Sequence, residues 1–325
     1  MTTGSSRPTL RSTFAVDPSI RLGLELPSLP APAGSDDAPA NGRGDLMASV
    51  AAADRSGFGS VWLTGGAHDG PTGTCDACTV ASGAAPLSKR LTLGVVAPLT
   101  GARSPSVLAR DVTALDVVSK GRAALCLADS PRGDAPASEG SHLGRLAEAV
   151  WICRALFTKD RTDWNGQWYH LSGAVNRPGP VRPGGPPLLV DAGDISGALR
   201  GSIEKKRGGA EGVQGPRRED VARLLTSIDG CVMTGTGNQV TAMRRALDAV
   251  SLELSIARVP VIWRGVLPEA EKQGPSAATA LHEAGADGLI VLVGRGSEDP
   301  GAPPSADRVE STGGVLAPLV GGWTS

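Results

Sequence analysis

The chain has 325 residues, a formal net charge of −1 and 40% hydrophobic residues, enough for a large apolar core. Aromatic residues make up only 3%, so Ala, Val and Leu must build most of that core. The balanced charge lacks the basic excess of a nucleic-acid-binding face, and no apolar run reaches the ~18 residues of a membrane span. The amino terminus shows no hydrophobic signal region, and the five scattered cysteines suit a reducing cytoplasm.

Short apolar segments alternate with segments of helical periodicity along the chain. We interpret residues 1–18 as a flexible lead-in and residues 19–325 as a single domain. Eight segments are predicted to be strands buried in a parallel sheet, namely residues 20–26, 60–64, 91–97, 123–128, 187–190, 230–234, 259–263 and 287–293. Helices are predicted at residues 46–55, 76–87, 105–120, 143–157, 219–228, 240–254 and 277–284, with a short last helix at 315–320. Long loops are expected at residues 27–43, 201–218 and 298–307.

Eight strands that alternate with helices favour an α/β fold, an eight-stranded parallel barrel of the TIM type with loop insertions. No Gly-x-Gly-x-x-Gly turn opens a strand–helix unit, which disfavours an open dinucleotide-binding sheet. Residues 91–128 show the repeating unit most clearly, because Ser104 can cap a helix whose first turn holds Pro105. The Asn-Gly pair at residues 165–166, between two β-prone stretches, predicts a hairpin.

Three sequence patterns resemble those of the luciferase-like family of flavin-dependent oxidoreductases. They are Arg-Leu-Thr-Leu-Gly at residues 90–94, Pro to Leu-Ala-Arg at 105–110, and Leu-Asp to Ser-Lys-Gly-Arg at 115–122. The resemblance continues at residues 57–62, 164–171, 186–193 and, more weakly, 284–288. The stretch from residue 171 to residue 193 is similar to the nitrilotriacetate-monooxygenase and pristinamycin-synthase branch.

The resemblance implies an enzyme whose site lies at the carboxyl ends of the barrel strands. Its implied cofactor is reduced FMN, supplied by a separate flavin reductase, and its implied activity is oxygen-dependent oxidation of a small organic substrate. The Ala-, Gly- and Pro-rich composition suits a GC-rich bacterial source, in which barrels of the family that it resembles often act on specialised metabolites. A deazaflavin-dependent oxidoreductase and a non-catalytic partner subunit without flavin binding stay open as alternatives. We expect a homodimer, with no metal ion, nucleic acid or membrane as partner.

The same resemblance implies that the loops after two strands bind the cofactor. The turn after the fifth predicted strand would hold the flavin phosphate through Ala192, Gly193, Asp194, Ser196 and Gly197. The Asp194 carboxylate would repel a phosphate if it pointed inward, which counts against this assignment. Cofactor contacts are also expected after the fourth predicted strand, from Ala128, Asp129 and Ser130.

Two residues at strand ends are the candidate catalytic groups. His68 follows the second predicted strand and would donate a proton or a hydrogen bond; otherwise it is a solvated loop residue. Arg264 ends the seventh and would hold an anionic group; the alternative is an ion pair with a barrel carboxylate. Asp191 would orient a substrate or form an internal ion pair, and Arg132 and Arg295 are weaker anion-binding candidates. Cys75 and Cys78 have C-x-x-C spacing, but without a second pair we interpret them as ordinary thiols.

Overall fold

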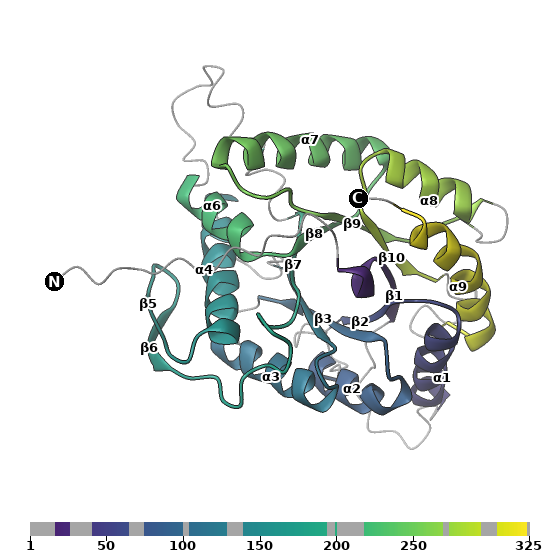
Figure 1. Cartoon of the computed structure of the whole chain (residues 1–325), viewed down its shortest axis with the longest axis horizontal. Helices are drawn as coiled ribbons and strands as arrows, with labels where there is room; N and C mark the ends of the chain where they lie inside the picture. Colours follow the sequence, from purple (N-terminus) through teal and green to yellow (C-terminus); the bar gives the residue numbers. More distant parts are fainter. Residues whose placement is uncertain are drawn as a thin grey trace.

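The computed structural model describes residues 17–26, 41–64, 75–99, 104–128, 139–193, 199, 218–268, 273–293 and 304–323. In this part of the chain, eight parallel strands close into a barrel in the order β1-β10-β9-β8-β7-β4-β3-β2 (Figure 1). The barrel strands are β1 (Leu22–Leu26), β2 (Ser60–Thr64), β3 (Thr92–Pro98), β4 (Ala123–Ala128), β7 (Leu188–Asp191), β8 (Gly230–Met233), β9 (Val261–Gly265) and β10 (Gly288–Leu292). The predicted eight-stranded parallel barrel is confirmed, and each predicted segment supplies one strand.

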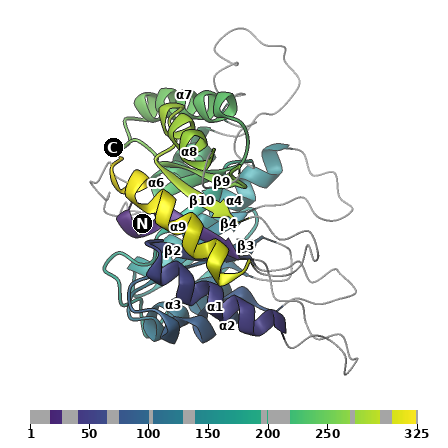
Figure 2. The ribbon, with the colours of Figure 1, turned by 90° about the vertical axis from the view of Figure 1, so that its right-hand side faces the viewer.

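Helices surround the barrel (Figure 1). They are α1 (Asn41–Arg55), α2 (Ala77–Ala84), α3 (Pro105–Val118), α4 (Glu139–Thr158), α6 (Arg218–Ser227), α7 (Gly237–Leu254), α8 (Gly274–Glu283) and α9 (Ala306–Gly321), with short 3-10 turns η1 (Pro18–Ile20) and η2 (Ala85–Leu87). Ser104 caps α3 as predicted, because its hydroxyl accepts the Ser106 N–H. Although α1 and α9 come from opposite ends of the chain, they lie side by side in Figure 2.

Several predicted element boundaries are wrong; the first helix, for example, begins at Asn41, within the loop predicted at residues 27–43. The last helix, α9, is 16 residues long instead of the six predicted, and it begins within the predicted loop, where Ser305 caps it. Gly313 lies where α9 approaches the end of α1, because a Cβ atom there would overlap the Ser56 side chain. Ile20, predicted to start the first strand, lies in η1, and its buried side chain joins the cluster inside the barrel.

The barrel interior is filled by side chains that alternate with those facing the helices. This inner cluster consists of Ile20, Trp62, Val96, Ala124, Cys126, Leu189, Val232, Ile262 and Ile290. Trp62 is fully buried, and its indole N–H donates to the Ser60 hydroxyl at 2.9 Å. Neighbouring strands carry Gly23 and Gly94 opposite the Trp62 ring, where a Cβ atom would overlap the indole. Within this described inner cluster, Trp62 is the one aromatic residue, and its ring fills the space between the strands.

The predicted hairpin forms an antiparallel pair of strands outside the barrel, β5 (Thr162–Asn165) and β6 (His170–Ala174). Its connecting residues wrap around the Glu148 carboxylate of α4. That carboxylate accepts the backbone N–H groups of Gln167, Trp168 and Tyr169 at 2.7–3.1 Å and the Trp164 indole N–H at 3.2 Å. The hairpin is thus fastened to α4 by a buried charge.

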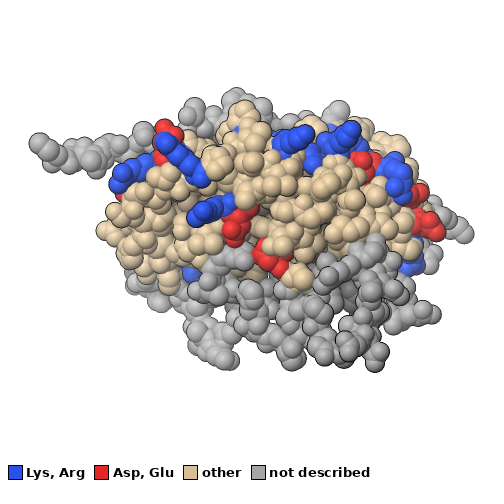
Figure 3. Space-filling view, turned by 90° about the horizontal axis from the view of Figure 1, so that it is seen from below, with Lys and Arg blue, Asp and Glu red and all other residues tan. Residues whose placement is uncertain are grey.

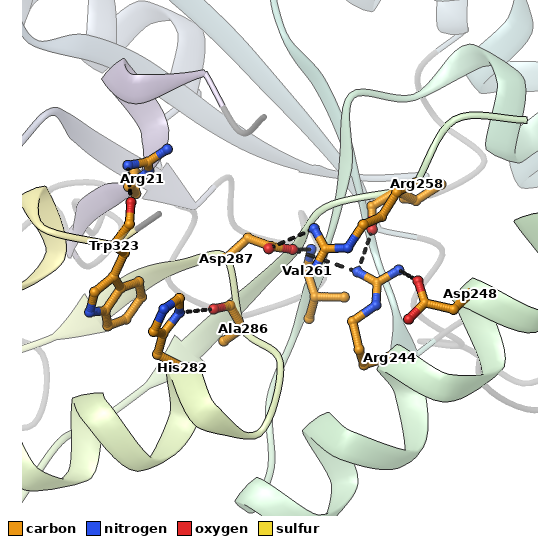
Figure 4. A network of polar contacts seen from close by, with 10 residues as sticks. Arg21, Arg244, Asp248, Arg258, Val261, His282, Ala286, Asp287 and Trp323 are labelled. Carbon is orange, nitrogen blue, oxygen red and sulfur yellow. Dashed lines mark hydrogen bonds and ion pairs between the residues drawn. The ribbon is translucent and has the colours of Figure 1, made fainter. Parts of the chain in front are cut away.

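Carboxylates tie the strands together at the amino end of the barrel (Figure 4). Asp287, directly before β10, accepts the Val261 N–H of β9 at 2.9 Å and pairs with Arg258 at 2.7 Å and with Arg244 of α7 at 3.6 Å. Asp229, directly before β8, repeats the pattern: it accepts the first N–H of β7 at 2.8 Å and pairs with Arg154 of α4 at 2.5 Å. Each carboxylate thereby links two strands and a helix.

Candidate functional site

Polar side chains from four strands meet inside the barrel at its carboxyl end. Glu25, Thr64, Asp191 and Arg264 are each the last or next-to-last residue of β1, β2, β7 and β9. In β1, Leu22, Leu24 and Leu26 pack in the outer core, so the alternation turns Glu25 inward. Barrels of this type carry their active sites at this end.

A buried ion pair forms the centre of this group. The Arg264 guanidinium donates from Nε to Glu25 Oε2 and from Nη2 to Glu25 Oε1, both at 2.5 Å. The Thr64 hydroxyl donates to the same Oε1 at 2.8 Å. The side chains of Glu25 and Arg264 are only 8% and 20% exposed. Two parallel hydrogen bonds fix the plane of the guanidinium as well as its position.

The third nitrogen of Arg264 is used differently. Nη1 lies 3.8 Å from Asp191 Oδ2, too far for a hydrogen bond. The other oxygen of Asp191, Oδ1, accepts the Gly193 N–H at 2.9 Å. Within the described ranges Nη1 makes no hydrogen bond. The Nη1 donor and the Asp191 Oδ2 acceptor therefore lie near each other without a hydrogen bond between them.

The ion pair sets the charge state of the site. Burial alone would lower the pKa of Arg264, but hydrogen bonding and the charge of Glu25 outweigh burial and raise it above its usual value. Arg264 therefore stays cationic at every physiological pH. Cys126, on the inner face of β4, has a pKa raised well above normal, first by burial and then by the charge of Asp191. Its thiol stays protonated and does not act as a nucleophile.

The structure brings together two of the candidates expected from the sequence, Arg264 and Asp191. Arg264 adopts the alternative considered for it, an ion pair with a barrel carboxylate. Ala128 ends β4 at the same end of the barrel and is half-buried. The other candidates lie outside the described residues; they are His68, Asp129, Ser130, Arg132, Asp194, Ser196, Gly197 and Arg295. Their assignments stay predictions.

The described part of the expected phosphate-binding turn uses its N–H groups internally. The Ala192 N–H donates to the Val232 carbonyl at 2.6 Å, which continues the pairing of β7 with β8. The Gly193 N–H donates to the Asp191 carboxylate. These two groups therefore do not offer donors to a phosphate in this structure, and a phosphate would depend on residues beyond them.

Sequence analysis did not identify Glu25 and Thr64 as site residues. A signal was available for Glu25, because it is the one charged residue in the strand Leu-Gly-Leu-Glu-Leu. A buried acid needs a cationic partner or several donors, so such a residue points to a hidden pair. The sequence around Thr64 carries no comparable signal.

Among the described residues, Arg264 fits a flavin ring, because its Nη1 offers uncommitted donors of the kind that ring carbonyl groups accept. Ala192 and Gly193 offer no donor to a flavin phosphate. Arg264 is thus the described residue that would lie beside a bound ring, and Ala128 ends β4 at the same end of the barrel.

The described residues were also compared with what metal ions, membranes and nucleic acids require. The described residues include no group of three His, Cys, Asp or Glu side chains placed to hold a metal ion. No described helix combines the length and apolarity needed to cross a bilayer. On the face in Figure 3, basic and acidic side chains are interspersed, without the continuous basic surface of a nucleic-acid-binding protein.

Comparison with known proteins agrees with this architecture. A family model described as luciferase-like monooxygenase matches residues 26–200, more than half of the chain. The fold is similar to coenzyme F420-dependent tetrahydromethanopterin reductase from Methanopyrus kandleri, with a TM-score of 0.65, 11% identity, and coverage of 92% of this chain and 99% of that one.

Two monooxygenase structures are also similar. RslO1 from Streptomyces bottropensis has a TM-score of 0.59 and 16% identity, and the match covers 92% of this chain and 98% of that one. The oxygenating constituent of 3,6-diketocamphane monooxygenase from Pseudomonas putida, solved with FMN, has a TM-score of 0.59, 15% identity and the same coverage. At such identities the structures show a shared fold, while the family model shows ancestry. The chain therefore belongs to the luciferase-like monooxygenase family, whose members are flavin-dependent oxidoreductases.

Proposed function

We propose that this protein is a monooxygenase that uses reduced FMN and oxygen to oxidise a small organic substrate. The observation that carries the proposal is the Glu25–Arg264 pair, a fixed cation at the carboxyl end of a luciferase-like barrel. A separate flavin reductase as the source of reduced FMN, a homodimer, and a role in bacterial specialised metabolism belong to the same proposal.

In this proposal, the residues of the chain bind the reacting groups and hold them in a fixed orientation. Arg264 stabilises negative charge that develops on a bound carbonyl oxygen, because its own charge is fixed in place before the reaction. Glu25 and Thr64 hold the guanidinium in one orientation. Reduced flavin, when bound, supplies the electrons for the oxidation. His68 remains the predicted proton donor.

Two alternatives have specific support. A deazaflavin-dependent oxidoreductase is favoured by the similarity to the F420-dependent reductase, which has a higher TM-score than the two monooxygenases. A non-catalytic partner subunit is favoured by the internal use of the Ala192 and Gly193 N–H groups. Both alternatives keep the barrel and change what its carboxyl end binds.

Anaerobic titration with reduced FMN and, separately, reduced F420 tests the proposal. We expect tighter binding of reduced FMN, and oxygen uptake when a flavin reductase and NADH are added. Arg264→Lys should weaken binding, since the single nitrogen of an ammonium group cannot lie both beside Glu25 and at the position of Nη1, where the outward donors are. Arg55→Lys, in an exposed ion pair between α1 and α9, is the matched control. Preference for F420 would support the reductase, and failure to bind either would support the partner subunit.

A further inference from the structure

The unjoined donor and acceptor at the carboxyl end carry a further inference. Arg264 and Asp191 have opposite charges and lie close together, yet their nearest atoms are 3.8 Å apart. The Glu25 side chain is 8% exposed, while those of Arg264 and Asp191 are 20% and 25% exposed. Exposure therefore increases from the buried pair towards the gap between Nη1 and Asp191.

Glu25 keeps this gap open. Its two oxygens hold Nε and Nη2, so the guanidinium cannot turn towards Asp191 without breaking a buried bidentate pair. Asp191 is held from the other side, because Oδ1 accepts the Gly193 N–H. Both groups are thus fixed by their own partners before any ligand arrives.

The charges at the gap select the kind of ligand. Glu25 balances the charge of Arg264, so Asp191 leaves the three side chains with a net negative charge. An anionic ligand would be repelled by Asp191, whereas a neutral ligand can use both groups. A carbonyl oxygen would accept from Nη1, and an N–H on the neighbouring atom would donate to Asp191 Oδ2.

We propose that Arg264 and Asp191 bind the carbonyl and N–H edge of a neutral imide, lactam or ureide, and that Glu25 is the positioning residue of this site. The inference rests on the proposed function and deepens it. Two sources share the chemistry: the pyrimidine edge of the flavin ring, where a carbonyl adjoins N3–H, and a substrate that carries an imide or lactam.

Methylation of the ligand nitrogen tests both sources. The flavin arm compares reduced FMN with reduced N3-methyl-FMN by anaerobic quenching of the tryptophan fluorescence of the protein, and the imide arm compares glutarimide with N-methylglutarimide by ligand-observed NMR. Wild-type protein should bind the N–H form about tenfold more tightly in at least one arm, the loss expected for one hydrogen bond to a charged group.

Two variants locate the effect. Asp191→Asn keeps an oxygen for the Gly193 N–H but turns an amide donor to the gap, so the preference for the N–H form should disappear. Glu25→Gln should also abolish it, because Arg264 becomes able to close on Asp191. Glu310→Gln, in the exposed pair with Arg55, should leave the preference unchanged. Urea unfolding of each variant shows whether it is folded under the binding conditions.

The outcomes separate the inference from the proposed function. Preference in the flavin arm alone identifies the flavin ring as the ligand, and preference in the imide arm alone identifies a substrate; either supports the inference. Equal binding of both members of each pair overturns it, even where FMN binds and the proposed function stands. Glutarimide preference without FMN binding supports the inference and contradicts the proposed function. Absence of binding in both arms overturns both.

Discussion

The two ends of the barrel use the same residue types for different purposes. At the amino end, Asp287 is surrounded by two arginines and a strand N–H. At the carboxyl end, one arginine lies between two carboxylates, and Nη1 makes no hydrogen bond to any described residue. An excess of donors around a carboxylate closes a network, whereas a donor held away from its acceptor leaves a place for a ligand. The amino end thus serves stability, and we propose that the carboxyl end serves binding, as is general for such barrels.

The largest expected loss of stability follows from a substitution in the network at the amino end. Asp287→Ala removes the buried acceptor of the Val261 N–H and the carboxylate of Arg258, and it leaves Arg244 paired with Asp248 alone, so the free energy of unfolding should fall by about 3–5 kcal/mol. Urea denaturation at neutral pH measures this loss. At the exposed ion pair of α1 and α9, Glu310→Ala should cost less than about 1 kcal/mol. A similar cost at the two sites would contradict a structural role for the amino-end network.

The second prediction asks what the carboxyl-end pair contributes. Arg264→Ala leaves Glu25 buried with the Thr64 hydroxyl as its one donor among the described residues, and should cost about 2–4 kcal/mol of unfolding free energy. The double variant Glu25→Leu with Arg264→Met should recover stability to within about 1 kcal/mol of wild type, because apolar residues of similar size can replace a buried pair. It should nevertheless lose flavin binding. Failure of the double variant to recover would mean that the pair is needed for folding.

The fold was largely predictable from sequence because its signals are local. Apolar runs at the strands and helical periodicity between them need no knowledge of distant residues. The errors arose where a distant contact changes the meaning of a local residue. Gly313 lies before the six residues predicted for the last helix, and in the structure it lets α9 approach Ser56. No local pattern contains that contact.

The site was predictable only in part, for the same reason. Arg264 and Asp191 were identifiable because charged residues at strand ends belong to the carboxyl rim. The pairing of Arg264 with Glu25 was not: the lone charge of Glu25 in an apolar strand indicates a hidden partner, but that partner lies 239 residues away in sequence. The two meet because β1 pairs with β10, and β10 with β9, when the barrel closes. Register across that closure is a property of the whole barrel.

A smaller expected effect is the loss of stability at high pH that two buried cysteine thiols cause. Burial raises the pKa of Cys153 and of Cys231 to about 12, although Arg154 and Arg244 of the amino-end networks partly oppose it. Unfolded thiols ionise near pH 9 while the folded ones keep their protons, so stability present below pH 9 is lost as pH rises towards 12. Each thiol contributes about 1.4 kcal/mol per pH unit to this decline.

Urea unfolding of wild type and Cys231→Ala between pH 8 and pH 10.5 measures that contribution. The variant loses some stability at every pH from its smaller side chain, but its decline above pH 9 should be shallower by about 1.4 kcal/mol per unit. Lys and Tyr titrate equally in both proteins and cancel in the comparison. Parallel declines would show that the Cys231 thiol already ionises in the folded barrel.

The smallest expected effect compares how much the Thr64 hydroxyl and the Arg264 guanidinium each stabilise the buried Glu25 carboxylate. Thr64→Val removes one of three hydrogen bonds to Glu25 and keeps the side-chain shape, so unfolding free energy should fall by about 1 kcal/mol. Both bonds from Arg264 remain, and the guanidinium keeps its orientation, so flavin affinity should change less than twofold. Thr64→Ser, which keeps the donor, is the control in both measurements. A loss as large as that of Arg264→Ala would instead make the Thr64 hydroxyl the main partner of the buried carboxylate, and the carboxyl end would then resemble the closed network around Asp287.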